Sequence, residues 1–503
     1  MNMNRRDFIG TTAAVTSAFT LRGNAALRRK QPNIVLVIAD QMNIDAISAY
    51  RRVFKDRAYN AHWIETPNLD WLVENGVSFM ESHSTDPVCS PARSSLFTGR
   101  MTCETGVFHN NIGINQNVPN LGQWFEQYTD YDRYYCGKWH AGGAWNCPEV
   151  DGPRKIPGFE TIPVDDSGVG RVMDYQIAAN IEAFIRNRMS GKPFLIVGGF
   201  LNPHDCCFWN PGLGKNMVTS GTDYFELGDQ LPELPPNQDV PLEPDGLTMI
   251  SRISEGIWGD MHWKNYIYDY LRQIETLDKN LGKILSAVRD RDDDTVLIFT
   301  SDHGDECGRH RRVGKWMPYQ PSVMVPLIFY GPNAGIQKGT IDEQHLISGV
   351  DLFPTVCDFA GISPTEKCRG MSLRPILEGR SPEQWRDYIY YSYQHTGRVI
   401  RSKKYKYVTR YEFSGQITKK KGDGKPDLPF VKKETRTASA FVPGKGERFE
   451  RIKHVQLFDI QNDAWEMNNL AGNAEYASVI AEHEAELTRW EGLLEINNRF
   501  DRN

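Results

Sequence analysis

The sequence has nine cysteines in 503 residues, but none of them form a Cys-x-x-Cys pair. A zinc site built from such pairs is therefore excluded. Apolar runs long enough to cross a bilayer are also absent, so we expect no membrane anchor. Neither sign of charge dominates, because 58 Lys and Arg stand against 64 Asp and Glu and leave a net charge of -6. This balance argues against nucleic acid as a partner, and any anion-binding surface must be local.

The first thirty residues predict a segment that is removed from the mature protein. Two adjacent arginines, Arg5 and Arg6, precede a modestly apolar run that ends at Thr20 and is followed by small residues. This arrangement resembles a twin-arginine export signal, and no cysteine follows it for lipid attachment. We therefore expect a periplasmic or secreted protein. The alternative is a basic N-terminal extension of a cytosolic protein.

The remaining length is enough for two domains, and the order of elements predicts an α/β fold. The stretches from Asn33 to Ala39 and from Asp294 to Thr300 contain continuous apolar runs of strand length, which predict strands buried on both faces of a parallel sheet. A helix is predicted to begin at Pro67 and to end before Gly76. A longer helix is predicted from about Trp263 to Val288, where apolar residues recur at helical spacing.

The C-terminal part shows a different pattern. The stretches from Asp387 to Tyr393 and from Lys404 to Thr409 alternate as half-exposed antiparallel strands do, and a helix is predicted from about Ala477 to Ile496. The stretch from Gln416 to Lys433 is charged and predicts a loop. We therefore predict a catalytic domain over residues 31–380, with a mostly parallel central sheet flanked by helices. A smaller α+β subdomain over residues 381–503 would contain an antiparallel sheet and the terminal helix.

The most informative stretch is Cys89-Ser90-Pro91-Ala92-Arg93, where a helix is predicted to begin. A thiol at the N-terminus of a helix is drawn toward the thiolate, and the free N–H groups there can hold an anionic ester. The stretch therefore indicates a nucleophile that faces an anion, with Arg93 as a fixed cation. The alternative is that Cys89 is a small buried apolar residue.

Two polar pairs follow predicted strands and indicate a metal site. Asp40 and Gln41 come directly after the first strand, and Asp302 and His303 follow a later one. Loops beyond the carboxyl ends of strands converge in open α/β sheets. Two carboxylates, an amide oxygen and an imidazole in that place suit a divalent cation. The alternative for each aspartate is a helix cap or a turn.

Three further motifs supply cations and proton carriers. Lys138 and His140 stand two residues apart in a G-K-x-H sequence and are predicted to point the same way from an extended segment. His204 ends an N-P-H sequence just past a predicted strand, and Lys315 follows a basic string. Taken singly, each has a structural alternative, as a solvated lysine or as a histidine with satisfied ring nitrogens.

Taken together, these motifs closely resemble the signatures of the formylglycine-dependent sulfatases of the alkaline-phosphatase-like superfamily. The resemblance rests on the Cys-x-Pro-x-Arg stretch at Cys89, the G-K-x-H and N-P-H motifs and the late Lys315, and it covers roughly residues 33–472. It implies an alkaline-phosphatase-like fold and the hydrolysis of a sulfate ester. It also implies that a formylglycine-generating maturase oxidises Cys89 to an aldehyde (3-oxoalanine).

The resemblance further implies a role for each residue of the motifs. A divalent metal, with Ca²⁺ favoured over Mg²⁺ or Mn²⁺, would be held by Asp40, Gln41, Cys89, Asp302 and His303. The catalytic set would be Cys89, Arg93, Lys138, His140, His204 and Lys315. A hydroxyl of the hydrated aldehyde would attack sulfur, and Arg93, Lys138 and Lys315 would stabilise the charge of the transition state. Either His204 or His140 would protonate the leaving oxygen. The second hydroxyl would then expel the sulfate, so an unmodified thiol is expected to fail.

Two residues depart from the common sulfatase pattern. Gln41 stands where many sulfatases have a second aspartate, and His303 stands where many have asparagine. Both replacements occur in the related phosphonate monoester hydrolases, so a phosphonate or phosphodiester hydrolase is the first alternative. Lys138 and His140 favour sulfate, because tyrosine and threonine usually replace them in those enzymes. A glycan-binding pseudoenzyme with an unoxidised Cys89 is the second alternative.

The expected substrate is a sulfated glycan, with aryl and choline sulfates as alternatives. The chain has twelve tryptophans. Four of them lie in or near the motifs and could stack on pyranose faces, namely Trp139, Trp145, Trp209 and Trp316. The identity of the sugar and the position of the ester do not follow from these residues.

Overall fold

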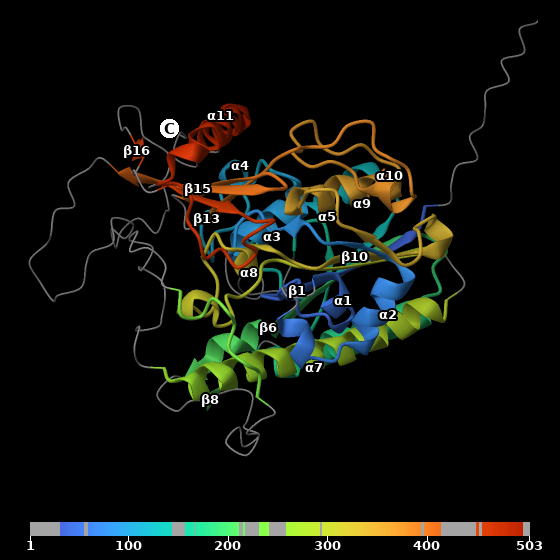
Figure 1. Cartoon of the computed structure of the whole chain (residues 1–503). Helices are drawn as coiled ribbons and strands as arrows, with labels where there is room; N and C mark the ends of the chain where they lie inside the picture. The colour runs from blue at the N-terminus through green and yellow to red at the C-terminus, as the bar shows by residue number, and fades with distance from the viewer. Residues whose placement is uncertain are drawn as a thin grey trace, which may run out of the picture.

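The computed structural model describes residues 31–54, 59–142, 156–165, 167–210, 215–216, 231–240, 258–291, 294–393, 397–413, 449–451 and 455–495. The predicted export signal, the loop predicted over 416–433 and Trp145 lie outside the described residues. Figure 1 shows a large sheet with helices above and below it and a second, smaller sheet at one side.

Eight strands form the large sheet, in the order β11-β2-β10-β9-β1-β6-β4-β5. They span Asn33–Asp40 (β1), Val77–Phe79 (β2), Asp132–Gly137 (β4), Glu160–Ile162 (β5), Phe194–Pro203 (β6), Thr295–Ser301 (β9), Leu327–Tyr330 (β10) and Thr340–Asp342 (β11). Among these eight, only β10 runs antiparallel to its neighbours. The predicted mostly parallel sheet is therefore confirmed.

The central strand β1 is buried along its whole length. Val35 and Val37 pack in one apolar cluster with α2, α6 and α7, whereas Ile34 and Leu36 pack in a second with α3, α5 and α9. These helices span Pro67–Asn75 (α2), Cys89–Thr98 (α3), Leu121–Tyr128 (α5), Gly170–Asn187 (α6), Asp260–Arg289 (α7) and Leu352–Ala360 (α9). Figure 1 shows α2 and α7 on one side of the sheet and α3, α5 and α9 on the other. Two covered faces explain why the strand is apolar from Ile34 to Ala39.

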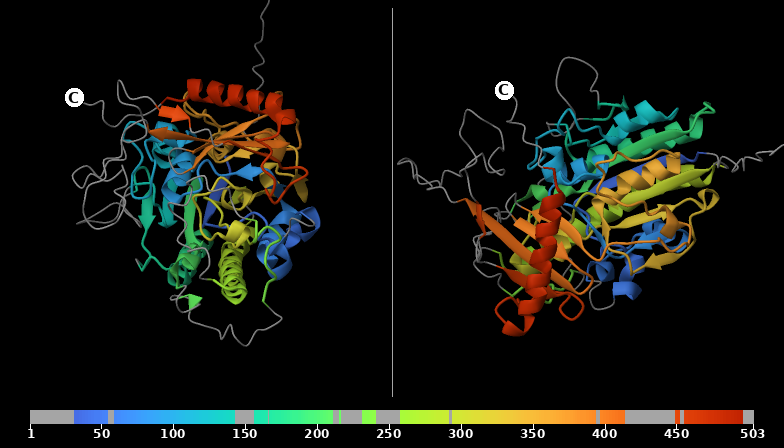
Figure 2. Two further views of the ribbon diagram at one scale, coloured as in Figure 1. Left: turned by 60° about the vertical axis from the view of Figure 1, so that its left-hand side comes forward. Right: turned by 90° about the horizontal axis from the view of Figure 1, so that it is seen from above.

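The second sheet is antiparallel, in the order β13-β14-β15-β16, with β17 paired to β15. Its strands span Ile389–Tyr393 (β13), Gly397–Arg401 (β14), Tyr405–Phe413 (β15), Phe449–Arg451 (β16) and Gln456–Asp459 (β17). The last helix, α11 (Ala477–Leu493), lies across these strands (Figure 2). This arrangement confirms the predicted antiparallel sheet and terminal helix.

The prediction that these strands are half-exposed is wrong, because every residue of β13 is buried. Tyr390 stacks on Trp490 of α11, with ring centroids 5.6 Å apart. Tyr391 and Tyr393, on the opposite face, join the apolar cluster of the large sheet. The alternation along the strand therefore reflects two covered faces, one under α11 and one against the rest of the molecule.

The remaining elements are short. They are η1 (Ser48–Tyr50), α1 (Arg51–Phe54), η3 (Asn60–Trp63), β3 (Ser82–His83), α4 (Thr102–Thr105), η4 (His204–Phe208), β7 (Trp209–Asn210), β8 (Lys215–Asn216), η8 (Arg309–Arg311), α8 (Gln320–Val323), η9 (Pro332–Ala334), β12 (Ile347–Ser348), η10 (Gly349–Asp351), α10 (Arg374–Leu377) and η12 (Ala474–Tyr476). In the described part of the chain, no helix combines the length and the apolar character needed to cross a membrane.

Candidate active site

Four neighbouring strands bring the predicted motifs to one edge of the large sheet. Asp40 is the last residue of β1, and Asp302 follows β9, which pairs with β1 in parallel. On the other side of β1, β6 leads into His204, and β4 beside it leads into Lys138. Because parallel strands end at the same edge of a sheet, residues far apart in the sequence meet here.

Helix α3 directs its N-terminus at this edge. It begins at Cys89, as predicted, and every one of its residues is buried. It ends at Gly99, whose φ of 67° lies in the left-handed region that favours glycine. The backbone N–H of Ser90 donates to Asn110 Oδ1 at 3.0 Å. The thiol of Cys89 therefore lies at the positive end of the helix.

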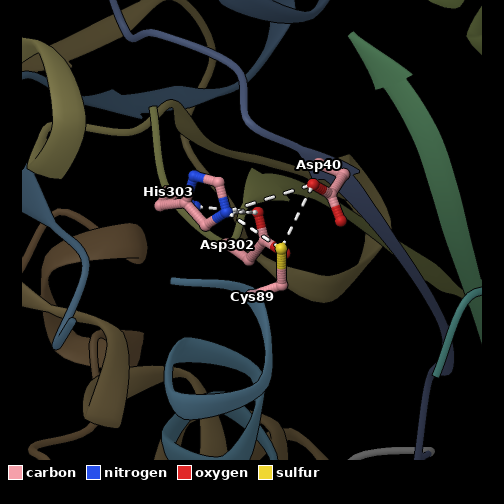
Figure 3. Close-up of side chains that lie close together, drawn as sticks. All are labelled: Asp40, Cys89, Asp302 and His303. Atoms are coloured by element: carbon pink, nitrogen blue, oxygen red, sulfur yellow. Dashed lines mark hydrogen bonds and ion pairs between the residues drawn. The ribbon is translucent and has the colours of Figure 1, made fainter. Parts of the chain in front are cut away.

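Four side chains at this edge could hold a metal ion. Asp40, Cys89, Asp302 and His303 are buried, and each offers a ligand atom within 4.8 Å of the others (Figure 3). Cys89 Sγ lies 3.2 Å from His303 Nε2 and 3.6 Å from Asp40 Oδ1. His303 Nδ1 lies 2.9 Å from the carbonyl oxygen of Gly304, which leaves Nε2 facing the cluster. Two carboxylates, an imidazole and residue 89 form a donor set that fits a divalent cation.

Three cations surround this cluster. Lys315 Nζ lies 2.9 Å from Cys89 Sγ, and the ammonium of Lys138 pairs with Asp40. Arg93 donates from Nε to Asp302 Oδ2 at 2.8 Å and from Nη1 to the carbonyl of Lys138 at 2.8 Å. Its Nη2 lies 3.4 Å from Asp40 Oδ2. The side chains of Arg93 and Lys138 are fully buried, so their charges are held in fixed positions.

These charges shift the pKa values of the cluster. Burial raises the pKa of Asp40, but the cations around it, above all Lys138, outweigh burial and hold the pKa well below its usual value. Burial and Asp40 also raise the pKa of Cys89, yet the two lysines and His303 outweigh them and keep it well below that of a free thiol. Residue 89 therefore lies in surroundings that stabilise an anion.

His140 reaches the cluster by a turn that the sequence did not predict. β4 ends at Gly137, and His140 has a left-handed φ of 51°, so the expected extended segment is wrong at this residue. His140 Nε2 lies 3.3 Å from Asn111 Oδ1. Burial lowers the pKa of His140 to about 4, against the opposing effect of a hydrogen bond with Cys89. The imidazole therefore lies beside the candidate nucleophile.

His204 is held by a turn that two buried carboxylates fix. It begins η4 directly after β6, and it is 7% exposed. Asp174 accepts hydrogen bonds from two backbone N–H groups at the end of β6, at 2.7 and 2.9 Å. Asp205 accepts hydrogen bonds from the first two N–H groups of α6, at 2.9 and 3.0 Å. Neither aspartate was predicted from the sequence, where the adjacency of Asp205 to His204 was the only signal for either.

Gln41 differs from the other predicted ligands in its contacts. Its Nε2 donates to Asp305 Oδ2 at 2.6 Å, and its Oε1 lies 3.5 Å from Cys207 Sγ. Its backbone N–H donates to Asp302 Oδ1 at 3.1 Å. Gln41 thus orients a carboxylate of the cluster through its backbone, and its role as a metal ligand stays a prediction. Asp305 was also missed, although it stands three residues after Asp302.

The tryptophans near the motifs have different surroundings. Trp139 is 1% exposed and packs against Phe97, with ring centroids 4.6 Å apart. Trp209 is buried against Tyr266, with ring centroids 5.8 Å apart. The interpretation of these two as sugar-binding faces is wrong, because core neighbours cover their rings. Trp316 is only half-buried.

Comparison with known proteins identifies the family of the chain. Residues 32–362 match the family model described as sulfatase, and residues 308–417 match the one described as N-sulphoglucosamine sulphohydrolase, C-terminal. A Delta 4,5-hexuronate-2-O-sulfatase of Bacteroides thetaiotaomicron is similar to this chain. It is 27% identical over 493 residues, which cover 92% of this chain and 90% of the relative.

Two solved structures show the same fold. One is a complex of a protein with its substrate, D-glucosamine-2-N,6-O-disulfate, and it matches with a TM-score of 0.69 and 20% identity over 94% of this chain and 100% of that chain. The other is a phosphonate monoester hydrolase from Silicibacter pomeroyi, with a TM-score of 0.66 and 18% identity over 93% and 96% of the two chains. At these identities the likeness shows the fold alone, and it confirms the predicted fold class.

Proposed function

Because the chain belongs to the sulfatase family and is therefore a sulfuric ester hydrolase, we propose that it removes sulfate from a sulfated carbohydrate. The observation that carries the proposal is the position of Cys89. Its sulfur lies at the start of α3, 2.9 Å from Lys315 Nζ and 3.2 Å from His303 Nε2. The relative named as a hexuronate-2-O-sulfatase supports a sugar as the leaving group.

Cys89 is proposed to act as formylglycine, made by a maturase from the thiol. In the hydrated aldehyde, two hydroxyls on one carbon supply both the nucleophile and the means of releasing the product. The low pKa that the surroundings impose on an acidic group at this position supports such a nucleophile. The Pro91 and Arg93 positions of the Cys-x-Pro-x-Arg stretch support recognition by the maturase.

The metal site is proposed to hold Ca²⁺ through Asp40, residue 89, Asp302 and His303, with Gln41 as a further ligand. When bound, the cation would neutralise sulfate oxygens and favour ionisation of the nucleophilic hydroxyl. The two carboxylates support a hard cation, and the imidazole also admits Mn²⁺. Arg93 and Lys138 already pair with these carboxylates and hold them in place.

Lys315 is proposed to bind the sulfate group directly. Its ammonium contacts the sulfur of Cys89, so an ester placed for attack by residue 89 lies within its reach. Lys138 and Arg93 are fully buried behind Asp40 and Asp302, and they stabilise the negative charge of the transition state from that side.

The two histidines are proposed to divide the proton transfers. His140 lies beside Cys89 and is placed to accept a proton from the nucleophilic residue. His204 enters from the end of β6, the strand next to the one that carries Asp40, and is placed to protonate the leaving sugar oxygen. The buried carboxylates of Asp174 and Asp205 fix the turn that carries His204.

The site also bears on the phosphonate alternative. The fold is shared with a phosphonate monoester hydrolase, so the fold does not decide between the two chemistries. Lys138 and His140 both lie in the site, where those enzymes usually have tyrosine and threonine, and this favours sulfate. A pseudoenzyme has little use for a nucleophile surrounded by three cations.

The protein is proposed to act in the periplasm or outside the cell after twin-arginine export. The support is the arginine pair Arg5-Arg6 before a short apolar run. Replacement of both arginines by lysine should leave the precursor in the cytoplasmic fraction. Unchanged recovery from the periplasm would contradict this route.

The proposed function is tested by measuring sulfate release from protein made with a maturase. Suitable substrates are N-acetylglucosamine 6-O-sulfate, an unsaturated 2-O-sulfated hexuronate disaccharide and 4-nitrophenyl sulfate, beside a phenyl phosphonate ester. We expect faster turnover of a sulfated saccharide than of the phosphonate. Preferred hydrolysis of the phosphonate would overturn the proposal.

A further inference from the structure

Two aromatic side chains from distant parts of the chain meet near the active site. His109 is exposed and Trp316 is half-buried, and their ring centroids lie 5.4 Å apart with 39° between the planes. His109 belongs to the loop after α4, and Trp316 follows η8. In the described part of the chain, neither ring belongs to an apolar core cluster. Core packing therefore does not explain why the two rings approach each other.

The loop that carries His109 is fixed to the active site. The next residue, Asn110, accepts the backbone N–H of Ser90 at the start of α3. The residue after it, Asn111, lies 3.3 Å from His140 Nε2. These two contacts hold the loop beside the positive end of α3, so His109 stands at the rim of the site.

The backbone of Trp316 is fixed to the segment that leads into the same helix. Its N–H donates to the carbonyl oxygen of Pro87 at 3.1 Å, two residues before Cys89. The preceding residue is Lys315, whose ammonium lies 2.9 Å from Cys89 Sγ. The indole is therefore attached one residue from the group that is proposed to bind sulfate.

Trp316 also has an unfavourable backbone conformation. Its φ of 85° lies in the left-handed region, where a bulky side chain is strained and glycine is preferred. Such strain persists where the surroundings or a ligand require it, and it is common at ligand-binding sites. Because no described core cluster includes the indole, burial does not account for a tryptophan at this position.

We infer that Trp316, with His109 beside it, binds the ring of the sugar that carries the sulfate ester. This inference rests on the proposed function, and it assigns the specificity of the enzyme for the sugar ring to Trp316. The C–H groups on the face of a pyranose pack well on an indole, and the polar edge of an imidazole can bind a hydroxyl. With the sulfate held at residue 89 and Lys315, the sugar ring is the next part of the substrate toward the rim.

The test uses Trp316→Gly, because glycine accepts the left-handed backbone while it removes the ring. For the sulfated saccharide that the wild-type protein hydrolyses fastest, KM should rise roughly tenfold, as expected for the loss of a stacking contact. The inhibition constant of inorganic sulfate should stay within about twofold, because the sulfate contacts are intact. The melting temperature of the variant should not fall, whereas removal of a tryptophan with a purely structural role would lower it.

Trp316→Phe should recover most of the affinity, and His109→Ala should give a smaller loss of affinity than Trp316→Gly.

Tyr175→Ala serves as the matched control, because Tyr175 is 59% exposed on α6 and is not part of the site. An unchanged KM in Trp316→Gly would overturn the inference, and so would an equal rise in the inhibition constant of sulfate. An effect confined to 4-nitrophenyl sulfate would assign the ring contact to an aryl group instead of a sugar.

A second measurement separates this inference from the proposed function. If wild-type protein releases no sulfate from any ester, the proposed function fails. Calorimetry of N-acetylglucosamine 6-O-sulfate with Cys89→Ala protein then tests the ring contact by itself. If the double variant Cys89→Ala/Trp316→Gly binds this sugar more weakly than Cys89→Ala does, the ring contact is supported. Equal binding by the two proteins, or no binding by either, contradicts the contact.

Discussion

The guanidinium of Arg93 donates from Nε to Asp302 Oδ2 at 2.8 Å, and neither side chain is exposed to solvent. The same guanidinium binds the carbonyl of Lys138 and lies 3.4 Å from Asp40. One planar group thus connects the ends of β1, β4 and β9. Lysine cannot reproduce this fork, because its ammonium is a single compact charge.

Arg93→Lys should therefore lower kcat/KM for a sulfate ester by roughly a hundredfold or more, since a misplaced buried charge weakens transition-state stabilisation. Steady-state kinetics with circular dichroism as a folding check would show this. Arg186→Lys is the control, because Arg186 makes a comparable fork with Glu182 and Asp290 on the surface. Activity within tenfold of wild type in Arg93→Lys would contradict the role of the fork.

Asp302→Ala should remove metal and activity together, because the substitution takes one carboxylate out of a donor set of four residues. Metal content after dialysis can be measured by plasma mass spectrometry. Asp239→Ala is the control, since Asp239 pairs with Arg311 at the surface. Stoichiometric metal in the Asp302 variant would show that this carboxylate is not a required ligand.

Lys138→Ala combined with His140→Ala should reduce sulfate ester hydrolysis more than any residual phosphonate hydrolysis. The reason is that this pair distinguishes the sulfatase pattern from that of the phosphonate hydrolases. The ratio of kcat/KM for the two ester classes is the quantity to compare between variant and wild type. An unchanged ratio would remove the pair as a discriminating feature.

His83 should make stability depend on pH. Burial, and then Arg401, lowers its pKa to about 3 in the folded protein, whereas the unfolded value is near 6.5. Below pH 6.5, His83 takes up a proton in the unfolded chain but stays neutral in the folded protein. The free energy of unfolding therefore falls as the pH drops toward 3. Between pH 8 and 5 the loss from this group should be about 2 kcal/mol.

In wild-type protein the rings of His83 and Tyr391 are stacked, with centroids 6.5 Å apart. The variant His83→Phe keeps a ring in this place, but phenylalanine cannot titrate. Denaturant unfolding at pH 8 and pH 5 should therefore show a smaller pH-dependent loss in the variant than in wild type. Equal losses in both proteins would mean that His83 is not the group responsible.

The centre of the large sheet was predictable because β1 and β9 are buried along their whole length and consist mainly of apolar residues. The long helix α7 was predictable for a similar reason, since apolar residues such as Leu271, Ile274 and Leu281 recur on one face. The burial of β13 was not, because polar and apolar alternation looks the same whether the second face meets solvent or another part of the protein. The residues of β13 alone therefore do not reveal that its second face packs against the rest of the protein.

In the candidate site, too, some features were predictable from the sequence and others were not. Asp40, Asp302 and His204 stand at or just past the ends of strands that pair in parallel, so their meeting is a consequence of the strand pattern. The turn at His140 and the amide contacts of Gln41 depend on left-handed backbone, which nothing in either residue type predicts. Asp174 was missed because it lies within a helix, where an aspartate gives no sign that it binds the end of a neighbouring strand.

The central claim is that Cys89 is converted to an aldehyde, and peptide mass spectrometry across residues 89–93 tests it most directly. In protein made with a maturase, the peptide should be about 18 Da lighter than one that carries the thiol. The peptide of Cys136, a buried cysteine in β4, is the internal control and should keep its mass. An unshifted thiol at Cys89 in protein that releases sulfate at full rate would contradict the account.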